Sequence, residues 1–223
     1  MPSKAKINFV KNTFDLERLF AIHANVSGQG EGRKHGVEVL NKSAIVLITA
    51  CLEAYIEDVV KEALIFLIKK CNDPDRIPNR VKNSALDPLR NSNDPMRVWE
   101  IAGSGWKKVL TDNKDRCIKK FIGQFNTPNP DNIDELIHNV LGFRKISSKW
   151  KWRGISKESS RNKLISYIEI RGAIAHRTKH MKNVTKAMAE DYLQFVERIV
   201  NIADNCLQEH IKNLTDELPW EAE

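Results

Sequence analysis

The sequence lacks any hydrophobic run long enough to cross a membrane. Its longest unbroken apolar stretch covers residues 63–68, whereas a spanning helix needs about 20 apolar residues. The N-terminal residues MPSKAKINF also lack the apolar core of a signal peptide. We therefore expect a cytoplasmic protein with no membrane partner.

Glycine, proline and cysteine are scarce, with 10, 8 and 4 residues in a chain of 223. Glycine and proline do not recur at the short, regular intervals that the turns of a β-sandwich or β-barrel require. The cysteines are widely spaced and form no CxxC pair, so we expect reduced and mostly packed thiols. With 41% apolar and 29% charged residues, the composition is that of a folded soluble protein.

Positive charge is concentrated in one part of the chain. The whole chain has a formal charge of +7. Residues 144–163 contain eight lysines and arginines against one acid, Glu158, and so account for the same excess. Such a segment attracts an anionic partner, of which RNA or DNA is the obvious candidate. A solvated loop that lysines keep soluble explains it equally well.

Apolar residues recur at steps of three and four along most of the chain, and no segment shows the alternation of a strand. The pattern predicts an all-α protein with a long second helix and a long C-terminal helix. We expect one domain over 1–223, with an N-terminal helix and loop (1–36) and a core bundle (37–215). The expected helices cover residues 12–27, 37–70, 96–110, 115–125, 131–143, 161–177 and 184–214. In the first of them, the expected apolar stripe consists of Phe14, Leu16, Leu19, Phe20 and Ile22.

The helical segment 161–177 places two polar residues beside an apolar face. Arg171 shares one face with Leu164 and Ile168, and His176 lies on the adjoining face. Five residues correspond to a turn of roughly 140° along an ideal helix, so the two side chains diverge. They converge on one substrate only if the arginine curls back, the helix bends at Gly172, or a second copy completes the site. The residues alone are better explained by ordinary polar contacts at a bundle end.

Two segments resemble a known family. RGAIAHR (171–177), which leads into the last helix, resembles the R-x(4–6)-H signature of the HEPN superfamily. AIVLITACLEAYIEDVVKEAL (44–64) resembles the LEAY-type second helix of its RiboL-PSP-like branch, and the resemblance spans roughly residues 37–210. It implies a HEPN-like helical bundle, commonly homodimeric. Many members are metal-independent ribonucleases whose paired motifs meet at the dimer interface.

The resemblance assigns catalytic roles to three residues. Arg171 and His176 match the motif arginine and histidine, and Glu53 matches an acidic position frequent in the earlier helix. A histidine can accept the proton of the RNA 2′-hydroxyl or protonate the leaving 5′-oxygen. An arginine can hold the phosphate with two hydrogen bonds. The expected products are a 2′,3′-cyclic phosphate and a 5′-hydroxyl, with no metal or other cofactor. Gly172 departs from the Asn or Asp that usually follows the motif arginine.

Two tryptophans alternate with cations in the basic segment, a pattern that can stack bases and hold phosphates. Two indoles that pin a loop to the bundle form an equally good interpretation. His176 and His180 are one turn apart, as zinc ligands can be, but no further ligands accompany them, so we expect no metal. The candidate RNA-binding residues are Lys149, Trp150, Lys151, Trp152, Arg153, Arg177 and Lys179.

The sequence therefore predicts an endoribonuclease that acts on RNA as a homodimer, in toxin or defence systems or in RNA processing. An antitoxin or another protein encoded nearby is a possible partner. Two alternatives stay open. One is a non-catalytic RNA-binding module of the same fold, which is indicated by Gly172 in place of the usual Asn or Asp. The other is a protein-interaction subunit whose basic segment docks an acidic partner.

Overall fold

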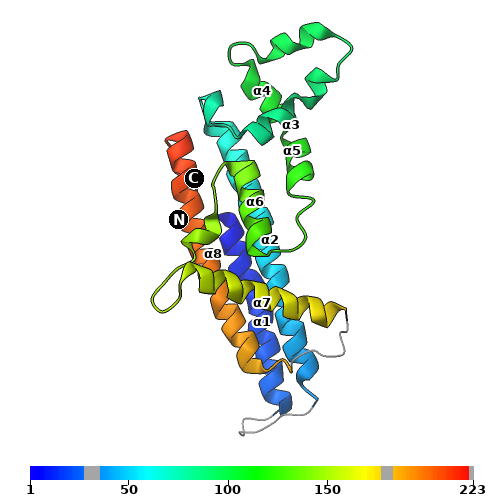
Figure 1. The fold of residues 1–223 in the computed structure, drawn as a ribbon, viewed down its shortest axis with the longest axis vertical. Coiled ribbons are helices and arrows are strands. Elements are labelled where there is room, and N and C mark those ends of the chain that lie inside the picture. Colours follow the sequence, from blue (N-terminus) through cyan, green and yellow to red (C-terminus); the bar gives the residue numbers. More distant parts are fainter. Residues whose placement is uncertain (28–35, 177–182, 221–223) are drawn as a thin grey trace.

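The computed structural model, which describes residues 1–27, 36–176 and 183–220, consists of packed helices (Figure 1). Throughout these ranges every regular element is helical, and the only strand-like feature is an isolated bridge between Trp152 and Ile155. The predicted all-α class is confirmed. The α-helices are α1 (Lys4–Ser27), α2 (Glu38–Lys70), α3 (Asn79–Arg90), α4 (Gly105–Asp112), α5 (Lys114–Phe121), α6 (Pro130–Leu141), α7 (Lys157–Ala175) and α8 (Lys186–Thr215). The 3-10 helices are η1 (Pro74–Arg76), η2 (Pro95–Ile101) and η3 (Ile146–Lys149).

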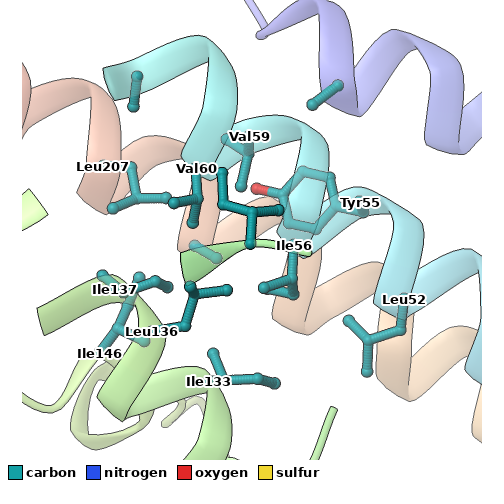
Figure 2. Packing of buried hydrophobic residues seen from close by; sticks show 14 of the residues in the cluster. Leu52, Tyr55, Ile56, Val59, Val60, Ile133, Leu136, Ile137, Ile146 and Leu207 are labelled. Atoms are coloured by element: carbon teal, nitrogen blue, oxygen red, sulfur yellow. The ribbon is translucent and has the colours of Figure 1, made fainter. Parts of the chain in front are cut away.

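Helix α2 is the centre of the bundle. Of the two arrangements that the pattern allowed over 37–70, one long helix or two with a kink, the structure has one helix from Glu38 to Lys70. Apolar side chains cover most of its circumference, and α1, α6, α7 and α8 all pack against it. A helix that is apolar on all sides is stable in water only when its neighbours cover it. Figure 2 shows the contact with α6 and α8, formed by Leu52, Tyr55, Ile56, Val59, Val60, Ile133, Leu136, Ile137 and Leu207.

Helix α1 begins at Lys4, eight residues before the predicted start at residue 12. Ser3 caps it, because its hydroxyl accepts a hydrogen bond from the Lys6 N–H at 3.0 Å. The carboxylate of Glu62 on α2 accepts two more, from the N–H groups of Lys4 (3.2 Å) and Ala5 (3.1 Å). A carboxylate at a helix N-terminus stabilises the unpaired N–H groups there. This one comes from a distant part of the chain, so local sequence could not reveal it.

The apolar stripe predicted for α1 is partly wrong. Leu16 is buried as expected, but Phe14 and Ile22 are 57% and 44% exposed. The core side of the helix instead includes Ala5 and Phe9, which the predicted start left out. Because the helix begins earlier, its true apolar face runs at steps of three and four from Ala5, which leaves Phe14 and Ile22 outside the packed face.

The helix predicted over 96–110 is wrong in its first half. Asp94 and Pro95 start the 3-10 helix η2 instead, since the Asp94 carboxylate accepts a hydrogen bond from the Met96 N–H at 2.9 Å. The chain then turns at Gly103, whose φ of +58° favours glycine. Helix α4 begins only at Gly105, where an added Cβ would collide with the backbone of η2.

Helix α7 lies across the bundle and crosses α1, α2 and α8 in Figure 1. It begins at Lys157, four residues earlier than predicted, because the Ser156 hydroxyl accepts a hydrogen bond from the Ser159 N–H at 3.1 Å. It ends at Ala175, so His176 forms its C-terminal cap and does not continue the helix as predicted. The motif thus lies at an exposed helix end.

The last helix closes the bundle and holds the N-terminus. The long C-terminal helix expected over 184–214 is present as α8, and its buried face includes Tyr192, Val196 and Leu207. Its buried Asp204 accepts hydrogen bonds from the backbone N–H and the hydroxyl of Ser3. All four cysteines are free, as predicted, and three of them are buried. Among the helices that the structure describes, none combines the length and apolarity needed to span a bilayer.

Candidate functional site

Arg171 lies on α7 where this helix packs against α2, next to α8. The residue is half buried. Burial raises the pKa of the Glu53 carboxyl on α2 and of the Tyr192 hydroxyl on α8, and the nearby guanidinium of Arg171 partly opposes both shifts. Within residues 1–27, 36–176 and 183–220, Arg171 forms no ion pair. The structure therefore brings two of the three predicted catalytic residues together and leaves the guanidinium available to an anion.

A pair of stacked tyrosines positions Arg171. Tyr167, one turn before it on α7, stacks on Tyr192 with ring centroids 4.0 Å apart and planes 13° from parallel. The Tyr192 hydroxyl lies 3.1 Å from Thr49 Oγ1 on α2, and the Tyr167 hydroxyl donates to the Asp191 carboxylate at 2.7 Å. These contacts tie α2, α7 and α8 together beside the site. Our sequence reasoning missed both tyrosines, although Tyr167 stands four residues before Arg171, a spacing that places them on one helix face.

The Glu53 carboxyl lies in a partly desolvated environment. Burial raises its pKa above the ordinary value, and the charge of Arg171 only partly opposes this. Burial also raises the pKa of Glu57, one turn further along α2, and the neighbouring charges of Glu53 and Asp58 add to the effect. Three carboxyls of α2 thus lie near one another, and the one on Glu53 is within the electrostatic influence of Arg171 on α7.

We expect the variant Glu53→Gln to reduce the pH dependence of stability. A raised folded-state pKa means that the stabilisation from protonated Glu53 is full below its ordinary pKa of about 4.3 and is lost as the pH rises through the raised pKa. Glutamine keeps the shape and remains neutral. In urea titrations between about pH 4 and pH 7, the variant should therefore lose less stability than the wild type. The exposed Glu169→Gln is the control, and an equal slope for both variants would contradict the prediction.

His176 is exposed at the end of α7, where its backbone N–H donates to the Gly172 carbonyl at 3.0 Å. Arg171 is instead half buried beside α2. The two predicted catalytic groups therefore differ in exposure, as their divergent helical positions suggested. His180, the other half of the considered zinc pair, lies outside the described residues.

Gly172 has open space beside it. A Cβ built there meets no atom of the described residues within 4 Å. Within residues 1–27, 36–176 and 183–220, no other segment therefore packs against the position where a side chain would begin.

Because this space is open, Gly172→Ala should stabilise the isolated protein. Glycine in a helix costs roughly 0.5–1 kcal/mol relative to alanine, and here the gain is not offset by a clash. We expect the melting temperature to rise by about 1–4 °C, measured by calorimetry. Gly142→Ala is a suitable comparison, because its φ of +75° makes the same change unfavourable. A lower melting temperature for Gly172→Ala would show that the space is used.

The basic segment 144–163 contains fewer unpaired cations than its sequence suggests, and those that remain lie in residues 144–153, here called the basic loop. Three basic residues of the wider segment 144–163 form ion pairs: Arg161 with Asp131 and Asp134, Lys163 with Asp191, and Lys157 with Glu158. The cations inside the loop are exposed and contact no carboxylate of the described chain. These are Arg144, Lys145, Lys149, Lys151 and Arg153. The charge available to an anion is therefore confined to the loop.

The two tryptophans of the loop have different environments. Trp150 is fully buried, so its indole has no face open to a nucleobase, and its predicted place among the RNA-binding residues is wrong for this conformation. Trp152 is half buried, packs against Phe195 at 5.9 Å between ring centroids, and carries Arg198 over its ring at 5.6 Å. Trp150 thus follows the alternative interpretation, in which an indole pins the loop to the bundle.

The basic loop and Arg171 lie toward opposite ends of α7. Fourteen residues separate Lys157 from Arg171, which corresponds to about 21 Å of helix axis. A ligand that contacts both must therefore be extended. Arg177 and Lys179, the other predicted RNA-binding cations, lie outside the described residues.

Comparison with known proteins gives one finding. A family model described as RiboL-PSP-HEPN matches residues 11–209. Neither the curated proteins nor the solved structures yielded a match. The matched range contains Glu53, Arg171 and His176, together with the whole basic loop.

Proposed function

The chain belongs to the RiboL-PSP branch of the HEPN superfamily, and from this premise we propose that it is a metal-independent endoribonuclease. The main support is the position of Arg171. It stands beside Glu53, forms no ion pair with the described residues, and has the motif histidine, His176, exposed at the end of the same helix. A guanidinium that forms no close ion pair keeps its donors for a phosphodiester.

The proposed reaction needs only groups that this chain carries. The RNA 2′-oxygen attacks the adjacent phosphorus, and one His176 accepts its proton. The bond from phosphorus to the 5′-oxygen breaks, and a second His176 donates a proton to the leaving oxygen. Arg171 stabilises the added negative charge on the phosphoryl oxygens. A 2′,3′-cyclic phosphate and a 5′-hydroxyl result.

A homodimer would supply the second histidine. The exposed side of α2 carries Val39 and Val46, which are 63% and 37% exposed, and Ala50 and Glu53 continue the same helix face. This apolar strip leads directly to the candidate site. Together with the open space at Gly172, it supports a partner copy that packs along α2 and brings its own α7 end close.

We further propose that the enzyme acts in the cytoplasm, in toxin or defence systems or in RNA processing. The four free cysteines are compatible with a reducing compartment.

The test is the chemistry of the products. Purified protein should cut RNA in the presence of EDTA and leave 2′,3′-cyclic phosphate and 5′-hydroxyl ends, which labelling and mass spectrometry identify. A single 2′-deoxy substitution at the cleaved position should block that cut, because the nucleophile is then missing. Cleavage that EDTA abolishes, or that persists at the 2′-deoxy position, would refute the mechanism.

A second function, RNA binding without cleavage, is favoured by one observation. Gly172 stands where the family usually has Asn or Asp, so one polar group that could orient the phosphate is missing. The two functions are separated by Gly172→Asn. If the wild type binds RNA in gel shifts without turnover and Gly172→Asn cleaves it, the chain is a binding module that lost its activity.

A further inference from the structure

The 3-10 helix η2 exposes an unusual group of large apolar side chains. Trp99 is 72% exposed, Met96 65%, Val98 51% and Ile101 38%. Single exposed apolar residues are normal, but four within one short element make a patch of the kind that marks an interaction site. Tryptophan and methionine are also enriched where proteins contact one another.

The patch borders a groove between α3, α4 and η2. The groove has a volume of ≈ 520 Å³, within the range of ligand sites. Ile101 belongs to both the patch and the groove. Most of the other walls are apolar and come from Ala85, Leu86, Trp106, Val109 and Leu110. Bulky side chains of a partner can therefore bury apolar surface there.

This surface is separate from the proposed ribonuclease site. In Figure 1, α4 lies at one end of the molecule with α3 next to it, and α5 lies beside α6, whereas α7 crosses the bundle on the opposite side of α6 from α4. RNA bound between Arg171 and the basic loop would follow α7 and leave the groove free. A distinct partner is required to explain the exposed apolar side chains.

The charge around the groove indicates the chemistry of that partner. Residues 74–121 contain eleven lysines and arginines against six acids. Lys82, which lines the groove, donates to the Pro74 carbonyl at 3.2 Å, and Lys107 donates to the Asn72 side chain at 3.2 Å. Neither forms an ion pair with the described residues. Asp75 is the acid among the lining residues.

We propose that this groove and η2 form a docking site for an acidic, amphipathic segment of a protein partner. Apolar side chains of the segment would fill the groove and cover Trp99, while its carboxylates would lie near Lys82 and Lys107. Apart from Trp106, the apolar walls of the groove are aliphatic, which favours a peptide over RNA, whose binding depends on phosphate contacts and stacking. This proposal does not depend on RNA cleavage.

The probes are two helical peptides of about 16 residues. They share Leu and Phe at positions i, i+3, i+4 and i+7, and differ in having either Glu or Lys on the opposite face. In fluorescence anisotropy with the full chain, we expect the Glu peptide to bind at least about fivefold more tightly than the Lys peptide. Trp99→Ala should weaken the binding of the Glu peptide about tenfold. Lys82→Glu should make the Lys peptide bind more tightly than the Glu peptide.

The matched control is Phe14→Ala, which removes an exposed aromatic side chain from α1 and should leave peptide binding unchanged. The proposal is overturned if neither peptide binds below about 200 µM, if both bind equally, or if Phe14→Ala has the effect of Trp99→Ala. It is also overturned if Trp99→Ala weakens the binding of a single-stranded RNA 20-mer and not that of the peptide, since the surface would then bind RNA.

Discussion

Replacing His176 with alanine should lower the rate of RNA cleavage by about 10²–10⁴-fold, the usual contribution of a positioned general acid or base. The loss should be large because both copies of a homodimer lose the group, and neither proton transfer then has a side chain to assist it. His176 is exposed and forms no described side-chain contact, so the melting temperature should stay the same. His138→Ala, which removes an exposed histidine of α6, is the matched control and should keep full activity.

Arg171→Ala tests the other half of the motif. It should lower the rate of RNA cleavage by about 10²–10³-fold, the range seen when one oxyanion-hole donor is removed. Because Arg171 is half buried, alanine also removes packing. Arg171→Lys keeps a charge without the planar pair of donors and should recover only part of the rate. Arg90→Ala, at an exposed arginine of α3, is the control. If His176→Ala and Arg171→Ala both stay within about twofold of the wild type in single-turnover assays, these residues are not catalytic.

Replacing Trp150 with alanine should destabilise the protein by about 3–5 kcal/mol, the usual cost of removing a fully buried aromatic side chain. Trp150 is 0% exposed within the main core, so the smaller side chain leaves a cavity among buried residues. At a few degrees per kcal/mol for a chain of this size, the melting temperature should fall by roughly 10 °C. Denaturant titrations measure the free energy directly.

Trp152→Ala is the matched control two residues away. This indole is half exposed, so its loss should cost less, about 1–2 kcal/mol, through the contacts with Phe195 and Arg198. Trp152→Ala should instead weaken RNA binding, and charge reversal at Lys151 and Arg153 should also weaken it. Trp150→Phe should lose less stability than Trp150→Ala, since the indole N–H has no hydrogen-bond partner in the described structure. A cost below about 1 kcal/mol for Trp150→Ala would show that the loop is not pinned by this residue.

The local pattern was enough to predict the helices whose packing follows from their own residues. The long helices expected over 37–70 and 184–214 are present as α2 and α8, because a long apolar repeat has no other way to avoid water. Helix α6 (Pro130–Leu141) lies within two residues of the expected range 131–143, with Asn129 as its N-terminal cap and Gly142 at its end. The motif Arg171 and His176, and the resemblance that it carries, were also readable without coordinates.

Distant contacts decided what the sequence alone could not. Glu62 extends α1 toward the N-terminus, and Asp131 and Asp134 neutralise Arg161, although long stretches of chain separate these groups. Burial of Trp150 and exposure of Trp99 likewise depend on which helices lie beside them. Spacing along one helix specifies the order and face of its side chains. The packing of the helices decides which charges remain unpaired and which aromatic rings are exposed to solvent. Both depend on neighbours that no local pattern contains.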